Sequence, residues 1–125
     1  MIDKARIEDW LERYRHAWMT DSHDDITGLF TDDVRYFTAP YRAPLRGIDE
    51  VIAYWLGEEE AGIPWTFEPE VLAQEGDLYV VRVVARYPEG TNDAEGAEEF
   101  HDLWLVTLTA DGRASEFVEY FMLTE

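Results

Sequence analysis

The C-terminal stretch from His101 to Leu123 constrains the fold more than any other part of the chain. It contains two runs rich in β-branched and aromatic residues, one on each side of Asp111-Gly112. An Asp-Gly pair between alternating apolar segments is the strongest short-range signal for a β-hairpin. The chain is therefore expected to end in a hairpin, and the preceding residues are expected to form the walls around it.

Both faces of this hairpin are mostly apolar. Side chains alternate across a strand, so Asp102 shares a face with Trp104 on the first arm. On the second arm, Glu119 shares a face with Phe117 and Phe121. A strand that is apolar on both faces is expected to be covered on both. The carboxylates at positions 102 and 119 should then lie among aromatic rings rather than in water, which suggests a site.

The charge of the chain excludes several classes of partner. There are 28 acidic and 10 basic residues, which give a formal net charge of -18. Nucleic acids and anionic membranes both need clustered Lys and Arg, so neither is an expected partner. The chain has no cysteine, and its carboxylates and histidines show no metal-ligand spacing, so no metal or cofactor is expected.

The length of the chain and its N-terminal pattern indicate the number of domains and the expected location of the protein. A chain of 125 residues fits one domain, residues 1–125, with a real core. The N-terminal residues lead into an amphipathic pattern instead of the apolar segment of a signal peptide, and no run approaches membrane-spanning length. A cytoplasmic protein is the expectation.

Helical periodicity occurs only in the first half of the chain. An apolar stripe predicts a helix over about 4–20 with Asp3 as N-cap, and Ser22 is placed to cap a short second helix. Apolar spacing from Ile48 to Trp55 predicts a third helix. The pattern thus places three helices before most of the strands.

Strands dominate the second half. Runs of β-type residues predict strands over 34–39, 65–73 and 78–87 before the terminal hairpin; 31–33 is expected to be a turn and 88–97 a mobile loop. Pro69 predicts that its strand is an edge or bulged strand. This order indicates an α+β fold, in which a curved antiparallel sheet packs on three N-terminal helices and forms a cone with a pocket at its wide end.

Arg82 is the most informative charged residue. It lies in the middle of an apolar strand between valines, and an unpaired buried charge is strongly destabilising. Asp102 and Glu119, on the neighbouring strands, are the candidate partners. One hypothesis is an Asp102–Arg82–Glu119 array that lines the pocket and carries catalysis. The alternatives are an ion-pair network with a structural role only, or a register in which Arg82 reaches solvent.

Aromatic and hydroxyl side chains are the further candidates for the wall of the pocket. Aromatic stripes on helices belong to the core more often than to ligand sites, and Trp55 and Trp65 can be explained by packing or by a lid. The ligand-binding candidates are Tyr14, Trp18, Tyr36, Thr38, Trp55, Trp104, Phe117 and Phe121.

The opposite face of the hairpin suggests a protein interface. It carries Leu103, Leu105, Val118 and Tyr120, and an exposed apolar patch of this kind usually marks an interface. We therefore expect a homodimer that forms through this outer sheet face.

Four features make the chain similar to the nuclear-transport-factor-2-like superfamily, particularly its SnoaL-like branch of polyketide-cyclase relatives. They are the aromatic first helix that ends before Ser22, the segments 26–34 and 45–55, and the Asp-Gly-Arg turn that precedes 117–121. The resemblance implies a cystatin-like α+β barrel. It specifies the activity poorly, because this fold hosts isomerases, dehydratases, epoxide hydrolases, cyclases and non-catalytic binders.

Two members of the superfamily give more specific comparisons. Tyr14 resembles the hydrogen-bonding tyrosine of ketosteroid isomerase, but Thr38 stands where that family has its general base. The position of that family's neutral acid aligns near Trp104. A threonine hydroxyl cannot act as a base near neutral pH, so steroid-type isomerisation is not expected.

Limonene epoxide hydrolase uses two carboxylates bridged by an arginine, and here Arg82 and Glu119 resemble the arginine and one carboxylate. The other carboxylate position is Val84, and Asp102 on the next strand is our own candidate to replace it. The sequence thus favours an acid/base enzyme acting on a small hydrophobic or oxygenated molecule. The alternative is a non-catalytic binding or dimerisation module.

Overall fold

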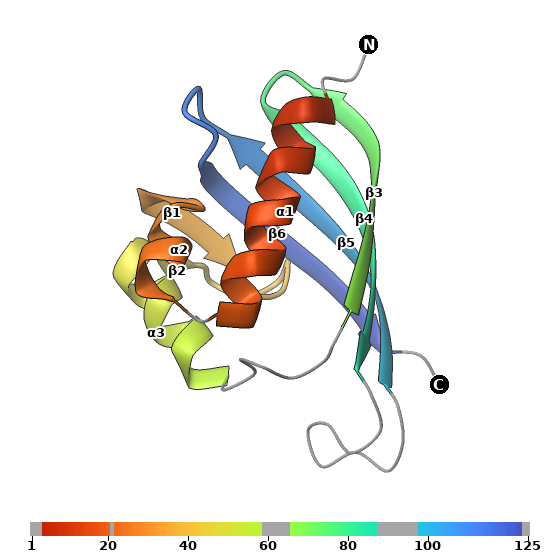
Figure 1. Ribbon diagram of the computed structural model, residues 1–125, viewed down its shortest axis with the longest axis horizontal. Helices are drawn as coiled ribbons and strands as arrows, with labels where there is room; N and C mark the ends of the chain where they lie inside the picture. The colour runs from red at the N-terminus through yellow and green to blue at the C-terminus, as the bar shows by residue number, and fades with distance from the viewer. Residues whose placement is uncertain (1–3, 21, 59–65, 88–97, 124–125) are drawn as a thin grey trace.

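The computed structural model describes residues 4–20, 22–58, 66–87 and 98–123 (Figure 1). Three helices and six strands follow one another along the chain. They are α1 (Lys4–Thr20), α2 (His23–Thr27), β1 (Phe30–Phe37), β2 (Leu45–Arg46), α3 (Ile48–Glu58), β3 (Thr66–Glu75), β4 (Leu78–Tyr87), β5 (Glu98–Leu108) and β6 (Ala114–Leu123). The predicted α+β class is confirmed. The Asp3 cap, Trp65 and the 88–97 loop lie outside the described residues.

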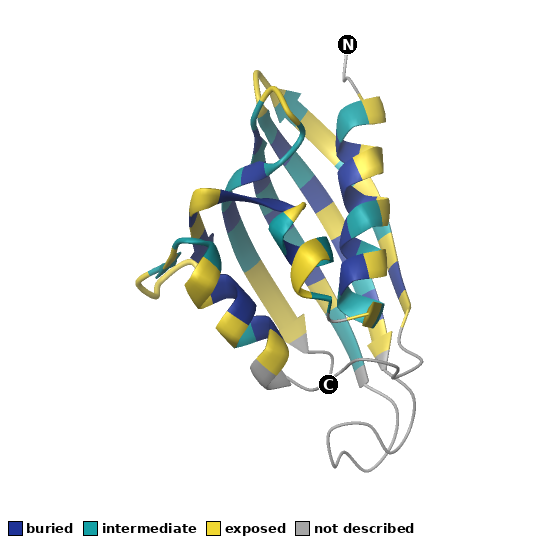
Figure 2. Ribbon diagram, turned by 60° about the vertical axis from the view of Figure 1, so that its left-hand side comes forward, coloured by how far each residue is buried: buried dark blue, intermediate teal, exposed yellow. Residues whose placement is uncertain are grey.

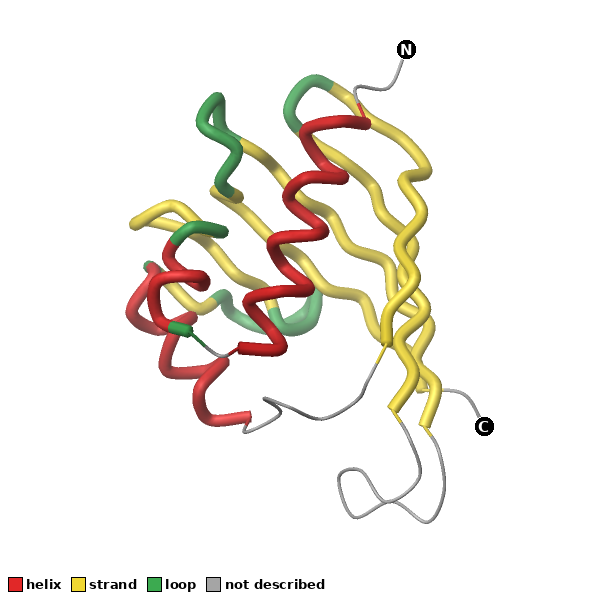
Figure 3. The backbone as a smooth tube through the Cα atoms, in the orientation of Figure 1, coloured by secondary structure: helices red, strands yellow, loops and turns green. Residues whose placement is uncertain are grey.

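One curved sheet contains all six strands, in the order β2-β1-β6-β5-β4-β3 (Figure 3). Four of its pairings are antiparallel, but β1 runs parallel to β6, so the sheet is mixed. The predicted turn at 31–33 was wrong, because these residues belong to β1. The register of β1 against β6 shifts between Phe30 and Arg35, and this irregularity accommodates the polar segment within a strand.

Helix α1 crosses one face of the sheet, which we call the inner face, and the opposite face is the outer face (Figures 1 and 2). The predicted stripe of α1 is buried: Ile7, Trp10, Leu11, Tyr14 and Ala17. The Trp10 indole Nε1 donates a hydrogen bond to the Leu29 carbonyl at 2.9 Å. This bond ties the helix to the segment that enters β1.

Two local signals act as the sequence predicted. The Ser22 side chain accepts a hydrogen bond from the Asp25 backbone N–H and caps α2. Gly112 adopts φ +83 in the turn between β5 and β6, a conformation that an L side chain rarely adopts. The turn joins the two arms of the hairpin in the expected antiparallel pairing.

The edge position of β3 also agrees with the sequence. This strand pairs only with β4 in the sheet order, and its register shifts between Val71 and Ala73 instead of at Pro69. Among the residues that the structure describes, no helix combines the length and the apolar character that crossing a membrane requires.

Candidate functional site

The two carboxyl groups of the hairpin lie on the inner face of the sheet. In the β5–β6 register Trp104 pairs with Glu119 and Asp102 pairs with Phe121, so Asp102 and Glu119 are diagonal neighbours. The Trp104 indole Nε1 donates a hydrogen bond to Glu119 Oε2 at 3.1 Å. We call Asp102 and Glu119 the carboxyl pair, and Trp104 fixes the orientation of one member.

Asp102 is buried in an unusual electrostatic environment. Only 8% of the residue is exposed, and its Oδ1 atom has no hydrogen-bond partner. Burial raises the pKa of Asp102 to about 6, because a carboxylate is poorly solvated there; hydrogen bonds from Glu119 and Trp104, and the nearby His101, oppose the rise. The group therefore changes its protonation state near neutral pH, as a general acid or base must.

Aromatic rings surround the carboxyl pair on the inner face, and Tyr14 of α1 is at their centre. Its ring centroid lies 4.7 Å from that of Trp104 and 5.1 Å from that of Trp55. Trp18 stacks on it at 6.1 Å, and Phe117 lies at 6.3 Å. The structure thus brings most of the predicted ligand-binding residues into one aromatic cluster with the carboxyl pair.

Tyr36 of β1 belongs to the same cluster. Its ring stacks on that of Phe117 at a centroid distance of 4.7 Å, and 3% of the residue is exposed. Burial raises the pKa of Tyr36 well above its ordinary value, and the negative charge of Glu119 raises it further. Its hydroxyl therefore stays protonated and is available as a hydrogen-bond donor close to the carboxyl pair.

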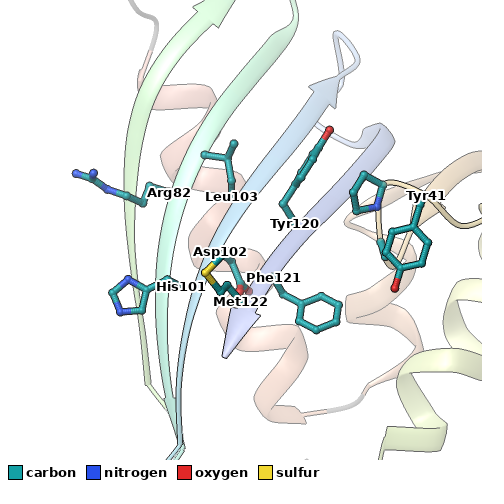
Figure 4. Close-up of a pocket in the computed structure, with 10 residues that line it drawn as sticks. Tyr41, Arg82, His101, Asp102, Leu103, Tyr120, Phe121 and Met122 are labelled. Carbon is teal, nitrogen blue, oxygen red and sulfur yellow. The ribbon is translucent and has the colours of Figure 1, made fainter. Parts of the chain in front are cut away.

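The other two predicted ligand-binding residues lie at the margin of this cluster. Thr38 is half-buried and follows the end of β1. Phe121 is 51% exposed because it lies near the end of β6, beyond the last residue that pairs with β1 (Figure 4).

Arg82 does not join the carboxyl pair, so the predicted Asp102–Arg82–Glu119 array was wrong. Arg82 pairs with Leu103 in the β4–β5 register, and therefore projects from the outer face, away from the carboxyl pair (Figure 4). Its guanidinium bonds Glu70 of β3, and 58% of each side chain is exposed. The alternative in which Arg82 reaches solvent is the one that the structure supports. Sequence analysis did not identify Glu70, although it is the residue opposite Arg82 on the edge strand.

A pocket of about 640 Å³ lies mainly on the outer face (Figure 4). The residues that line it are Ala39, Pro40, Tyr41, Arg82, His101, Asp102, Leu103, Tyr120, Phe121 and Met122. Most of these strand residues project from the outer face, but Asp102 and Phe121 are inner-face residues that also line the hollow, so it reaches one member of the carboxyl pair. Met122 continues the alternating outer-face pattern of Val118 and Tyr120, whereas Tyr41 lies in a loop and belongs to no periodic apolar pattern that could have indicated it.

Metal-binding potential can be tested on the described part of the chain. Within residues 4–20, 22–58, 66–87 and 98–123, no group of three or more His, Cys, Asp or Glu side chains could hold a metal ion.

A family model that describes a SnoaL-like domain matches residues 11–117. The chain belongs to the SnoaL-like domain family. This match covers α1 from residue 11 onward, the β1 and α3 segments, the first arm of the hairpin and the start of β6 up to residue 117. No curated protein sequence matches this SnoaL-like chain.

Solved structures confirm the fold. SalBIII, described as an epoxide hydrolase/cyclase-like enzyme in pyran ring formation in the polyether salinomycin, has a TM-score of 0.75 at 17% identity, over 96% of this chain and 92% of that chain. A ketosteroid isomerase-like protein from Erwinia carotovora atroseptica has a TM-score of 0.68 at 21% identity, with coverages of 94% and 95%. An LEH-like epoxide hydrolase of M. tuberculosis has a TM-score of 0.68 at 13% identity, with coverages of 91% and 80%. At these identities the similarity shows a shared fold, and this fold serves several activities.

Proposed function

We propose that this SnoaL-like protein is an enzyme that uses its own carboxyl pair for acid/base chemistry on a small hydrophobic or oxygenated molecule. Hydrolysis, isomerisation and cyclisation are the reaction types that such a pair can promote. Glu119 and Asp102 are the proposed catalytic residues, and the aromatic cluster on the inner face is the proposed binding wall. Arg82, which the sequence suggested as a third catalytic residue, has no place in this proposal.

The observation that carries the proposal is the environment of Asp102. A buried carboxyl whose pKa is raised to about 6 lies beside a second carboxyl that is held by an indole N–H. Two interacting carboxyl groups whose environments differ can hold one proton between them, so that one acts as an acid while the other acts as a base.

The proton transfers of such a reaction can be written in balance. The ionised member of the carboxyl pair accepts a proton from a water molecule or a substrate hydroxyl as the oxygen of that molecule attacks carbon. The protonated member donates its proton to the oxygen of the C–O bond that breaks. The pair then holds the same number of protons as before, and proton transfer between the two carboxyl groups restores the starting state.

The similar structures support the reaction class and leave the substrate open. Two of them are described as epoxide hydrolase-like and one as ketosteroid isomerase-like. Opening of an epoxide and isomerisation of a ketone both need a base and an acid near one oxygen atom. The aromatic wall of Tyr14, Trp18 and Phe117 favours an apolar body for the substrate.

The proposal is tested by screening turnover of apolar epoxides and cyclic ketones, followed by Glu119→Gln and Asp102→Asn. Each variant should lose activity by about 100-fold or more, since each removes a proton-transfer group. Glu116→Gln is the matched control, because Glu116 lies on the same strand and pairs with Arg35 at 2.9 Å on the outer face. Full activity in Glu119→Gln would contradict the proposed role.

A second proposal concerns the outer face, where we expect two copies to associate as a homodimer. Tyr120 is 42% exposed and Met122 is 70% exposed, and both line the outer pocket. The same face carries the pairs Arg35–Glu116 and Arg82–Glu70, so its local charge is more balanced than that of a chain with a net charge of -18. Apolar side chains among balanced charges favour a self-complementary interface.

Sedimentation equilibrium tests the dimer. The wild-type protein is expected to sediment at twice the chain mass, and Tyr120→Glu at the mass of one chain, because a carboxylate would be buried at the interface. A wild-type monomer at high protein concentration would contradict this proposal. It would leave the acid/base proposal standing, because that proposal concerns the inner face.

A further inference from the structure

Two buried side-chain polar atoms lack a hydrogen-bond partner in the part of the chain that the structure describes. They are the indole Nε1 of Trp55, which is a donor, and Oδ1 of Asp102, which is an acceptor. Buried polar groups are normally paired, because an unmade hydrogen bond retains the full cost of removing the group from water. Both atoms belong to the aromatic cluster on the inner face, and the proposed reaction assigns a role only to Asp102.

The other buried indoles show how unusual Trp55 is. Trp10 Nε1 donates to a backbone carbonyl at 2.9 Å, and Trp104 Nε1 donates to Glu119 at 3.1 Å. Trp55 is 1% exposed, and its ring is fixed by Tyr14 at 5.1 Å and by Trp18 at 4.8 Å between centroids. Its N–H is thus held in a rigid position without an acceptor.

The rings of Tyr36 and Trp55 both pack against Phe30, at 5.6 and 5.8 Å between centroids, so the two side chains lie in one part of the cluster. Trp55 lies close enough to the Tyr36 hydroxyl to oppose the rise in the Tyr36 pKa, but no hydrogen bond of acceptable geometry satisfies the indole N–H. The charge of Glu119 also acts on the same hydroxyl. A hydrogen bond from Tyr14 acts on it as well, so the Tyr36 hydroxyl interacts with Trp55, Tyr14 and the charge of Glu119 on the inner face.

We propose that Trp55 Nε1 and the Tyr36 hydroxyl form a two-donor subsite that binds one acceptor oxygen of the substrate. This inference rests on the proposed function and narrows its substrate class. The substrate is an uncharged molecule with an apolar body and a carbonyl, epoxide or ether oxygen. Its oxygen lies between the two donors, and the atoms that exchange protons lie toward the carboxyl pair.

The surrounding charges explain why the ligand should be neutral. Glu119 lies near the subsite, and the chain as a whole has a net charge of -18, so a carboxylate or phosphate would be repelled. A neutral oxygen avoids this repulsion in the ground state. Fixed donors are most effective when negative charge develops on that oxygen during the reaction, because they need no reorganisation.

The test uses a pair of ligands that differ in one atom group, cyclohexanone and methylenecyclohexane. They have similar shapes, but only cyclohexanone offers an acceptor oxygen. In an ¹H–¹⁵N spectrum of the indole N–H groups, cyclohexanone should move the Trp55 signal downfield, and methylenecyclohexane should not. The Trp10 signal should stay in place, because its donor is already satisfied. Trp55→Phe identifies the signal by its loss.

Binding affinities provide the second readout. Tyr36→Phe, which preserves the ring, should weaken cyclohexanone binding about three- to tenfold and leave methylenecyclohexane binding unchanged. Tyr79→Phe is the matched control, because that hydroxyl contacts Gln74 away from the site. Equal behaviour of the two ligands, or a stationary Trp55 signal, would overturn the subsite and indicate that a buried water alone meets the donors.

The outcome separates this inference from the proposed function. Glu119→Gln should retain the Trp55 shift, because it keeps both donors, while it abolishes turnover. A Trp55 shift without turnover of any substrate would support the subsite and contradict the acid/base enzyme. Turnover that depends on Glu119 without a Trp55 shift would contradict the subsite alone.

Discussion

Charged residues on the inner and outer faces of strands β3, β4 and β5 lie in opposite environments. On the outer face, Arg82 bonds Glu70 with 58% of each side chain exposed. One residue along the register, Asp102 projects inward with 8% of the residue exposed. Arg82 and Asp102 are thus near neighbours in the sheet, but one is exposed to solvent and the other is buried.

This difference indicates which face can carry chemistry. An exposed ion pair is screened by water, so the pair of Arg82 and Glu70 contributes little to the stability of the fold. Asp102, by contrast, loses most of its hydration, and this loss raises its pKa to about 6. That value is close to the pH at which acid/base enzymes work. The face on which a charged residue lies, more than its place in an apolar strand, therefore determines whether its pKa is shifted.

The largest expected effect comes from truncating one aromatic residue on each face. Phe117→Ala should lower the free energy of unfolding by about 3–5 kcal/mol, because it leaves a cavity among packed rings. Phe117 is fully buried, whereas Tyr120 is 42% exposed, so Tyr120→Ala should cost about 1 kcal/mol or less. Urea denaturation, measured at low protein concentration so that association does not contribute, checks both values. Similar losses for the two variants would contradict the contrast between the faces.

The second expected effect, from Asp102→Asn, is an increase in the free energy of unfolding instead of a decrease. Because the pKa of Asp102 in the folded protein is raised from 3.8 to about 6, the folded state binds a proton more tightly than the unfolded state between those pH values. The contribution of the Asp102 carboxyl to stability is therefore fully present below about pH 4 and is lost as the pH rises through 6. Asp102→Asn removes the cost of the buried charge and should stabilise the protein at pH 7.5 by about 1–2 kcal/mol, since water screens part of that charge.

Urea denaturation at pH 7.5 and pH 3.5 checks this prediction. The gain should disappear at the lower pH, where Asp102 is protonated in both states. The matched control is Asp77→Asn, because Asp77 is an exposed carboxylate with 66% of its side chain in solvent. A destabilised Asp102→Asn protein at pH 7.5 would show that the carboxylate is well accommodated.

The smallest expected effect tests the outer ion pair. Arg82→Met should change the free energy of unfolding by less than about 1 kcal/mol and leave catalytic activity unchanged. A double-mutant cycle with Glu70→Gln should give a coupling energy of about 0.2–1 kcal/mol that decreases in 1 M salt. Loss of activity in Arg82→Met would restore the hypothesis that Arg82 acts with the carboxyl pair.

The sequence predicted the inner face well because that prediction needed only alternation within a strand. The Asp111-Gly112 turn defined the hairpin, and the pattern correctly placed Asp102 with Trp104 and Glu119 with Phe117. Spacing also gave helix α1 and its buried stripe, since local periodicity depends on few distant contacts.

The failures occurred where pairing between strands decides the result. Arg82 lies in a run of valines on both sides, so the apolar pattern did not show which face it occupies. Only the register, in which Arg82 lies opposite Leu103 and Glu70, reveals the outer face. The segment 31–33 was predicted as a turn because its residues favour turns, but it lies within β1 between Phe30 and Arg35, which pair with Ala114 and Glu116 of the distant β6.

The most direct test of the account is a ¹³C NMR titration of the Asp102 side-chain carboxyl, with its signal assigned by its loss in Asp102→Asn. The account predicts that Asp102 titrates near pH 6, and that Glu119→Gln alters its titration because the two carboxyl groups interact. A midpoint near pH 4 that is unaffected by Glu119→Gln would contradict the carboxyl pair and, with it, the proposed acid/base enzyme.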